Sequence, residues 1–405
     1  MRDLTLLFVS RGVRLFAYGF LSVVLVLYLR ELGLSDGRVG LLLTLTLLGD
    51  TALTIWLTTL ADRCGRRRML LVGASLMVMA GLVFAATRNP IWLLAAATIG
   101  VISPSGSEVG PFLAIEQAAL TQLLKPERRT LLFAWYNLLG SFTTACGALV
   151  AGEACAAMQA GGAAGAAIYR PVVQSYGLLG LVLGACVLGL SAAVELPAHE
   201  KPHASTGRSG LGQSRKLVAK LSVLFAMDAF GGGFVVQAVL AYWFTIRFGV
   251  EPVTLGKLFF AANLLAGASS LMAVWLARRI GLINTMVFTH LPSNVLLMLV
   301  PLMPTFPLAA GLLFIRYGLS QMDVPTRQSY LMAVVSPAER SAAAGWTMMA
   351  RSLGAACSPA LAMQLIALPH GIAWPLYLSG VIKIAYDLLL YREFVHVKPP
   401  EERTA

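Results

Sequence analysis

Long apolar runs alternate with short polar breaks along the whole chain. A helix needs about 20 apolar residues to cross a bilayer, and the runs reach this length repeatedly. Short breaks that contain proline, such as Met303–Pro307 and Leu368–Gly371, divide the longest apolar stretches into two. We predict twelve membrane-spanning helices, at roughly 5–29, 37–58, 69–87, 91–122, 131–155, 172–194, 218–245, 254–277, 282–302, 306–333, 344–366 and 372–391.

The longest polar break lies in the middle of the chain and contains Pro, Gly and Ser. It separates the predicted spans into two sets of six. We therefore predict an N-terminal six-helix bundle at 1–194, a cytoplasmic linker at 195–217 and a C-terminal six-helix bundle at 218–405. His199 and His203 in the linker are interpreted as solvated side chains rather than metal ligands.

Composition identifies an integral membrane protein. The chain has 405 residues, of which 58% are apolar and 12% are charged. A soluble domain has about a quarter of its residues charged. The net charge of +12 could suggest nucleic acid, but the basic residues gather in alternate loops, so no nucleic-acid partner is predicted. Because Lys and Arg near span ends are retained inside, this asymmetry predicts that both termini are cytoplasmic.

The loop between the second and third spans has the most distinctive sequence, Leu-Ala-Asp-Arg-Cys-Gly-Arg-Arg-Arg at residues 60–68. Asp62 can cap a helix or pair with a guanidinium, and Gly65 permits a tight turn at positive φ. The segment resembles the loop motif G-x-L-A-D-R-x-G-R-R/K-R/K of the major facilitator superfamily, although Thr58 replaces its first glycine. A generic positive-inside loop is the alternative. The resemblance implies that Asp62, Arg63, Gly65 and Arg66 control opening of the cytoplasmic side.

The two halves of the sequence repeat. Residues 60–65 recur as Leu-Ala-Arg-Arg-Ile-Gly at 276–281, and an offset of 211 aligns Glu116 with Arg327. A duplicated six-span unit is the parallel repeat of major facilitator transporters, with the solute site between the halves. The resemblance implies an all-α membrane fold of twelve transmembrane helices in two pseudo-symmetric bundles, acting as a monomer by alternating access.

Several charged residues lie within predicted spans, where each costs at least about 2.5–3.5 kcal/mol unless it faces a cavity or a partner. The first half has bases on span 1 and an acid on span 4, and the second half has an acid on span 7 and a base on span 10. These swapped signs predict one ion pair in each half. A rival interpretation pairs the span 4 acid with Arg66. The gating or structural residues are Arg11, Arg14, Glu116, Asp228 and Arg327.

Span 4 contains the sequence Ile-Ser-Pro-Ser-Gly-Ser-Glu-Val-Gly-Pro at residues 102–111. Two prolines and two glycines break a regular helix, and broken backbone is tolerated where it lines a cavity or is buried in protein. Ser105 and Ser107 are therefore candidates for the solute cavity. Glu108 is a candidate proton carrier or cation ligand. The alternative is a proline kink with Glu108 hydrated near the outer surface.

Asp50 is the other candidate for proton coupling. It lies near the middle of span 2, about 18 Å along the helix from Asp62, and no basic residue neighbours it in sequence. A carboxyl group without a nearby base can gain or lose a proton as its surroundings become dry or wet. The alternative is a hydrogen bond that only packs two helices.

Span 10 carries Arg316, Asp323 and Arg327 at spacings that fall on one stripe of a continuous helix. Arg316 is the candidate for binding an anionic group, and Asp323 is a second cavity candidate. Alternatively, Asp323 and Arg327 only neutralise one another.

Other polar residues of the second half are predicted to have structural roles. His290 on span 9 is interpreted as structural, and Lys383 with Asp387 as a local pair at i and i+4 on span 12. Arg351 on span 11 is expected to bear on the loop motif or on the cavity.

The sequence lacks the signatures of other functions. It has no nucleotide-binding loop of the form G-x-x-x-x-G-K-[ST], no H-E-x-x-H and no G-x-S-x-G, and its five cysteines form no C-x-x-C pair. We therefore predict no enzyme activity, cofactor or metal. The resemblance implies a secondary transporter that lies in the lipid bilayer and carries a small organic solute. We expect it to be located in a bacterial inner membrane.

The sequence constrains the direction of transport less than it constrains the fold. Proton-coupled efflux is the first hypothesis, although span 5 lacks the Gly-Pro pattern of drug:proton antiporters and span 4 lacks their arginine-glycine motif. Proton-coupled uptake of an anionic metabolite is the alternative. A non-transporting membrane enzyme or receptor is a minor one.

Overall fold

The computed structural model describes residues 2–108, 110–123, 126–195, 212–336 and 339–397. The side chains of residues 62, 63, 126–131, 134 and 341 lie outside this description. So do His199 and His203 and most of the predicted linker. In the described part of the chain every regular element is a helix, which confirms the all-α fold class.

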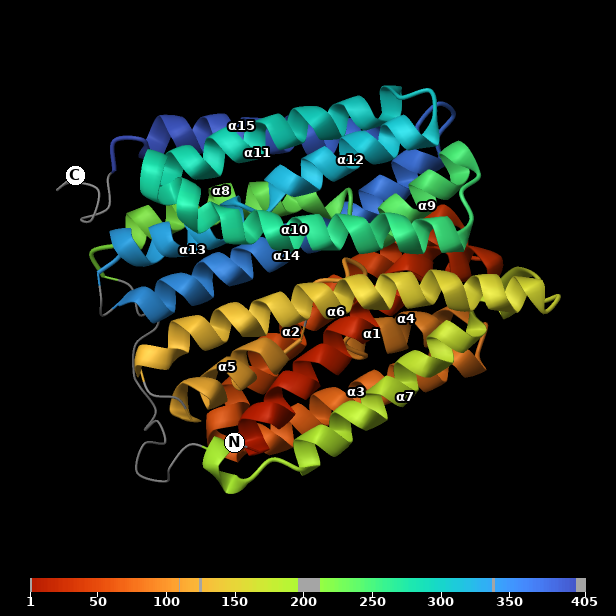
Figure 1. Cartoon of the computed structure of the whole chain (residues 1–405), viewed down its shortest axis with the longest axis horizontal. Helices are drawn as coiled ribbons and strands as arrows, with labels where there is room; N and C mark the ends of the chain where they lie inside the picture. Colours follow the sequence, from red (N-terminus) through yellow and green to blue (C-terminus); the bar gives the residue numbers. More distant parts are fainter. Residues whose placement is uncertain (1, 109, 124–125, 196–211, 337–338, 398–405) are drawn as a thin grey trace. The chain divides into compact units, whose positions relative to one another are not determined.

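Contacts divide the chain into two compact units, Met1–Ser205 with Gln237–Phe260, and Thr206–Val236 with Ala261–Ala405. We call them the first and second units. The boundaries predicted from the polar break, 1–194 and 218–405, stay a prediction. The helices of the first unit are α1 (Arg2–Glu31), α2 (Asp36–Cys64), α3 (Arg66–Ala86), α4 (Pro90–Ile99), α5 (Phe112–Leu123), α6 (Pro126–Ala160), α7 (Arg170–Leu188) and α9 (Gln237–Phe248) (Figure 1).

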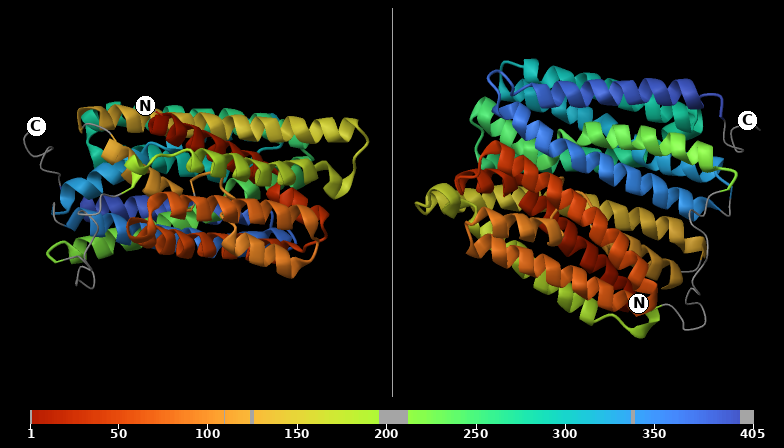
Figure 2. Two further views of the ribbon diagram at one scale, coloured as in Figure 1. Left: turned by 90° about the horizontal axis from the view of Figure 1, so that it is seen from below. Right: turned by 180° about the vertical axis from the view of Figure 1, so that it is seen from behind.

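The second unit contains α8 (Arg215–Gly233), α11 (Leu282–Leu299), α12 (Phe306–Ser320), α13 (Asp323–Val334), α14 (Arg340–Ala367) and α15 (Trp374–Phe394). The long helix α10 (Pro252–Ile280) contributes to both units. Within each unit the helices run side by side in all three views (Figures 1 and 2).

Length and composition alone identify eight helices in the described residues that could cross a membrane. One of them runs over α8 and α9 together. Three of the twelve predicted spans are each two shorter helices in the described residues: 91–122 divides into α4 and α5, 218–245 into α8 and α9, and 306–333 into α12 and α13. The interruptions of the fourth and tenth spans fall in spans that repeat one another.

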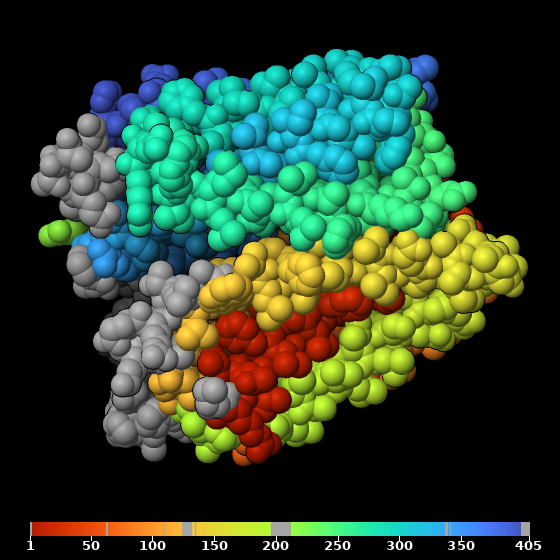
Figure 3. All heavy atoms as spheres, viewed as in Figure 1, coloured from red at the N-terminus to blue at the C-terminus, as the bar shows by residue number. Residues whose placement is uncertain are grey.

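Glycines bring the central helix of each unit against its neighbour. A Cβ atom at Gly19 of α1 would overlap the backbone of Thr144, and one at Gly147 of α6 would overlap the carbonyl of Phe16. Such small residues let membrane helices approach closely. On one face of the first unit α1 is visible between α6 and α7 (Figure 3).

The second unit repeats this packing between α8 and α14. A Cβ atom at Gly354 of α14 would overlap the backbone of Ala226, and one at Gly233 of α8 would overlap Ala355 and Ser358. Helix α8 therefore has the same place in the second unit that α1 has in the first, as the sequence repeat predicts.

The repeated loop motif is a single-residue turn in both units. Gly65 has φ 107° and Gly281 has φ 86°, so both have the positive φ expected of the motif glycine. Each donates its N–H to the carbonyl four residues earlier, Ala61 and Ala277, at 3.0 Å. The predicted basic turn is shorter than expected, because α2 continues through Asp62 to Cys64 before Gly65 breaks it.

Candidate functional site

A cluster of buried charges joins α1 to the broken fourth span. Arg14 donates to both oxygens of Glu116 at 2.8 Å, and both side chains are fully buried. Arg11 and Arg14 also contact the two oxygens of Glu108 at 2.8 Å. Ser10 donates to Glu116 at 2.6 Å. We call the four charged residues the first cluster; it contains two cations and two anions.

Local structure explains how these side chains meet. Arg11 and Arg14 lie three residues apart on α1 and so share one face of the helix. Glu116 lies on α5, whereas Glu108 lies in the non-helical segment between α4 and α5. The aromatic rings of Tyr136 and Phe112 cover the two guanidinium groups, at 4.2 and 4.7 Å from the ring centres. Tyr136 also donates its hydroxyl to Glu116.

The first cluster decides between the alternatives for these residues. The predicted pairing of Glu116 with α1 is present through Arg14. The rival pairing with Arg66 is wrong, because the guanidinium of Arg66 contacts Gln122 at 2.7 Å and the carbonyl of Val194 at 3.2 Å. A hydrated Glu108 at the outer surface is also wrong, since two arginines hold it and its side chain is only 15% exposed.

The broken segment between α4 and α5 satisfies its backbone through other elements of the first unit. Tyr176 donates to the carbonyl of Val101 at 2.7 Å, and the N–H of Ala238 donates to that of Pro104 at 3.0 Å. Ser103 donates to the carbonyl of Ser107 at 2.7 Å. Non-helical backbone in a membrane protein needs such partners. The predicted break is therefore present.

The serine side chains of this segment differ in what they can offer a solute. The hydroxyl of Ser105 accepts from the N–H of Ser107 at 3.3 Å and so helps to shape the turn. The side chain of Ser107 is exposed. Contact of either serine with a solute stays a prediction.

Asp50 lies on α2 beside the same broken segment. Its Oδ1 is buried without a hydrogen-bond partner, and the backbone N–H of Gly110 lies next to the carboxyl group. A Cβ atom at Gly110 would lie 3.7 Å from Oδ1, at ordinary van der Waals distance. Within the described residues no Lys, Arg or His forms an ion pair with Asp50, which distinguishes it from Glu108 and Glu116.

A second cluster of buried charges is centred on Asp228 of α8. Its Oδ1 accepts from Lys383 of α15 at 2.6 Å, and its Oδ2 accepts from Arg351 of α14 at 2.9 Å and from Arg327 of α13 at 3.3 Å. The predicted pair of Asp228 and Arg327 is therefore present. Asp323 contacts Arg327 at 2.6 Å.

The second cluster continues to α11 through a histidine. His290 Nδ1 lies 2.8 Å from Asp387 Oδ1, and His290 Nε2 lies 3.7 Å from Asp228 Oδ1. Asn294 donates to the other oxygen of Asp387 at 3.1 Å. The predicted local pair of Lys383 with Asp387 is wrong, because Lys383 reaches Asp228 and Asp387 bonds to α11. We define the second cluster as Asp228, His290, Asp323, Arg327, Arg351, Lys383 and Asp387.

Span 10 is not one continuous helix, because it is interrupted at Gln321–Met322 and α13 begins at Asp323, so the predicted stripe stays a prediction. A continuous helix is needed for the spacing to place all three residues on one face. The alternative, in which Asp323 and Arg327 neutralise each other, agrees with their 2.6 Å contact. Arg316 remains on α12, where it is 8% exposed and its Nε has no hydrogen-bond partner.

Two carboxylates outside the membrane helices hold the ends of the predicted linker. Glu195 accepts from the backbone N–H of Arg66 at 2.6 Å and of Arg67 at 3.1 Å, at the start of α3. Glu339 likewise accepts from Gly212, Gln213 and Ser214, before α8. Hydrogen bonds from Ser214 and its neighbours lower the pKa of Glu339. An anion at a helix N-terminus also interacts favourably with the helix dipole. The side chains of Asp62 and Arg63 lie outside the described residues.

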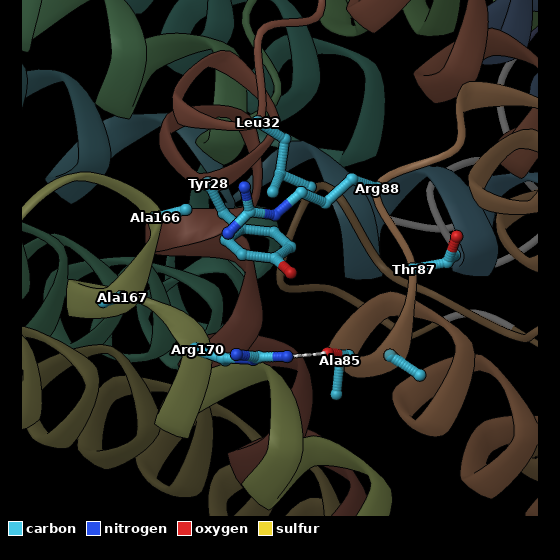
Figure 4. Close-up of a pocket in the computed structure, with 9 residues that line it drawn as sticks. Tyr28, Leu32, Ala85, Thr87, Arg88, Ala166, Ala167 and Arg170 are labelled. Atoms are coloured by element: carbon cyan, nitrogen blue, oxygen red, sulfur yellow. Dashed lines mark hydrogen bonds between the residues drawn. The ribbon is translucent and has the colours of Figure 1, made fainter.

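A separate surface pocket lies at the far ends of α1, α3 and α7 (Figure 4). It includes Tyr28 and Arg88, and Arg170 donates to the carbonyl of Ala85 at 3.1 Å. Tyr28 is 14 residues from Arg14, or about 20 Å along α1. The pocket therefore does not contain the charge clusters. Among the described residues no group of His, Cys, Asp and Glu could hold a metal ion.

The family model described as Major Facilitator Superfamily matches residues 7–359. The chain belongs to the Major Facilitator Superfamily. As a member of this superfamily it is a transporter of small solutes and not an enzyme.

Similar proteins match this major facilitator protein over nearly the whole length of both chains. An uncharacterized membrane protein of Saccharomyces cerevisiae, YJR124C, is 29% identical, over 98% of this chain and 95% of its own length. Solved structures with the same fold include the nucleoside transporter NupG, at 14% identity, a TM-score of 0.72 and 98% coverage of both chains. A D-xylose-proton symporter has 15% identity and a TM-score of 0.72, covering 96% of this chain and 97% of its own.

Sequence reasoning missed the part of this major facilitator protein that joins α11 and α15 to Asp228. His290, Asn294 and Asp387 are each visible as polar residues within spans, but His290 was predicted to be structural and Asp387 to pair with Lys383 on its own helix. A sequence alone gives no partner for a residue on another helix. The available signal was the cost of burying Asp387 and Lys383, which should have required partners beyond their own helix.

Loss of Glu116 should destabilise this major facilitator protein strongly. Glu116→Gln removes a fully buried partner of Arg14, and breaking a buried ion pair costs about 3–5 kcal/mol. We expect a clearly lower thermal unfolding midpoint of the purified protein in detergent. The matched control is Glu393→Gln, which breaks an exposed pair with Lys220 worth at most about 1 kcal/mol. Equal midpoints for the two variants would contradict the structural role of Glu116.

Proposed function

We propose that this protein is a proton-coupled secondary transporter that exports a small organic solute by alternating access. The observation that carries proton coupling is Asp50. It places a carboxyl oxygen without a hydrogen-bond partner beside a broken span, and no described cation pairs with the carboxyl group. A coupling carboxyl group must be ionised in one state and protonated in another, so it must not be paired permanently with a cation.

The contacts of Glu108 make it the weaker coupling candidate. Two guanidinium groups contact Glu108 and bring it together with Glu116 in a neutral set. A proton added there would leave a buried arginine incompletely compensated, which is costly. We therefore assign Glu108 to holding the broken segment on α1 and assign proton exchange in the first unit to Asp50.

The loop motif and the termini complete the proposal. Asp62, Arg63, Gly65 and Arg66 are proposed to control opening at the cytoplasmic side, and the gathering of basic residues in alternate loops supports cytoplasmic termini. The protein is proposed to act as a monomer. The expectation of a bacterial inner membrane stays a prediction, and the yeast relative shows that similar proteins also occur in a eukaryote.

The Asp50→Asn variant tests proton coupling. In liposomes containing the purified protein, a panel of nucleosides, pentoses and organic anions, chosen from the solutes named for proteins of this fold, identifies a transported compound. For that compound, Asp50→Asn should abolish accumulation driven by an imposed pH gradient. Exchange of internal for external solute should persist, because exchange requires no net proton movement.

An exposed acid of the same unit provides the control. Glu153→Gln removes a carboxylate that is 54% exposed in a weak contact with Lys257, and it should leave both activities unchanged. Full gradient-driven accumulation by Asp50→Asn would contradict the coupling role. The orientation of the gradient that drives accumulation decides between export by antiport and uptake by symport.

One observation favours the second candidate, proton-coupled uptake of an anionic metabolite. Arg316 is a buried guanidinium, and no described carboxylate lies within ion-pair distance of it. A buried cation without an anionic partner is costly, and an anionic solute could supply that partner. The broken helix beside Arg316 supports a place near the solute.

Arg316→Gln separates anionic from neutral solutes. A hydrogen bond to a charged group contributes about 1.5–3 kcal/mol, so loss of the guanidinium should raise the KM for an organic anion at least about tenfold. The KM for a neutral pentose or nucleoside should change little, and Arg316→Lys should recover part of the anion affinity. Equal effects on anionic and neutral solutes would argue against this candidate.

A further inference from the structure

The imidazole of His290 lies between two buried carboxylates from different helices. Its Nδ1 is 2.8 Å from Asp387 of α15, whereas its Nε2 is 3.7 Å from Asp228 of α8. Asp387 is fully buried, and His290 is 4% exposed. The other oxygen of Asp387 accepts from the amide of Asn294. Among the described residues no Lys or Arg forms an ion pair with Asp387, whereas three of them hold Asp228.

Charges from every packed helix face this pair. Asp228 carries Lys383, Arg351 and Arg327, and Asp323 partly neutralises Arg327. The ring of Tyr386 lies edge-on to His290 with centres 6.0 Å apart, and Arg316 lies on the neighbouring helix α12. When His290 is neutral and Asp387 is ionised, the second cluster contains three cations and three carboxylates. Binding one more proton then gives the cluster a net positive charge.

The His290–Asp387 pair is the place where this proton can be exchanged most readily. Protonating Asp228 would leave three cations, of which Arg327 and Lys383 are buried, short of a partner, and removing a proton from an arginine is not accessible in proteins. Histidine is the side chain suited to exchanging a proton between pH 5 and 8. We propose that His290 and Asp387 form a second proton-binding site of this transporter, in the second unit.

Protonation of His290 would change the hydrogen bonds that connect α8 to α11 and α15. With both ring nitrogens carrying hydrogen, His290 can donate to Asp387 through Nδ1 and toward Asp228 Oδ1 through Nε2. Lys383 already occupies that oxygen at 2.6 Å. The stem of Lys383 lies against Gly231 of α8, where a Cβ atom would come within 2.9 Å of its Cγ. The added proton therefore sets His290 in competition with Lys383 for Asp228, at the contact between α8, α11 and α15.

This inference rests on the proposed proton coupling, but its test measures the proton directly. The chain has five histidines, of which His370 and His396 are exposed and His199 and His203 lie in the predicted linker. Replacing these four by Gln leaves His290 as the only histidine without changing the second cluster. The full chain labelled with 15N-histidine and purified in lipid nanodiscs is then titrated from pH 8.5 to 5.

We expect the nitrogen resonances of His290 to change from those of a neutral to those of a protonated ring within this range. Asp387→Asn in the same background should move the midpoint by about one pH unit, equivalent to a tenfold change in proton affinity. The matched control is Glu393→Gln, an exposed acid on the same helix α15, which should leave the midpoint unchanged. Resonances that do not change with pH, or a midpoint that Asp387→Asn does not move, would overturn the proposal.

The outcome is separable from that of the proposed function. If Asp50→Asn uncouples transport while the His290 ring does not titrate, the second proton site is wrong and proton-coupled transport stands. If His290 titrates as expected but no pH gradient drives any transported solute, the proton site stands and the coupled function is wrong. A variant that fails to fold is replaced by Asn294→Leu, which removes the amide that donates to Asp387 and lies 3.2 Å from His290 Nδ1, and which should also move the midpoint.

Discussion

A charged side chain within a membrane helix needs a partner from the protein, and this requirement organises both units. Neither the bilayer nor a neighbouring apolar helix can stabilise an isolated guanidinium or carboxylate. In the first unit Arg14 meets Glu116 with both side chains fully buried. In the second unit Asp228 meets cations from α13, α14 and α15. The helices that supply the partners must therefore be adjacent.

Close backbone packing makes these contacts geometrically possible. Gly19 and Gly147 let α1 and α6 approach, and Gly354 of α14 does the same for α8. The interruption between α4 and α5 places Glu108 off the helix axis, where both α1 arginines reach it. Small residues and a broken helix thus determine which charges pair. The groups outside such permanent pairs, Asp50 and His290 with Asp387, are then the ones available for exchange of a proton.

Part of this arrangement could be predicted from the sequence. The swapped signs of the two halves predicted the contact of Asp228 with Arg327, because a repeat relates the helices that carry them. The proline and glycine content predicted the break before Phe112, and the loop motif predicted the turn at Gly65. These predictions succeeded because each depends on local sequence or on the duplication.

Other features depend on contacts that a single sequence does not encode visibly. Lys383 has a possible partner four residues away, yet it bonds to Asp228 of another helix at 2.6 Å. By contrast, the interruption of span 10 at Gln321–Met322 has a local signal, because Pro325 cannot donate to the carbonyl of residue 321 and its ring clashes with that carbonyl in a continuous helix. The role of His290 required knowledge of which helices pack against α11. Similarly, contacts place Gln237–Phe260 with the first unit, although these residues follow the polar break.

The central claim is that proton and solute movements are linked, and linkage is reciprocal. The most direct measurement uses liposomes that contain the purified protein and a trapped pH-indicator dye, with a gradient of a transported solute and no initial pH difference. The account predicts that the solute gradient alone changes the internal pH, and that Asp50→Asn removes this change while solute exchange continues. Solute flux with a constant internal pH in the parent protein would contradict it.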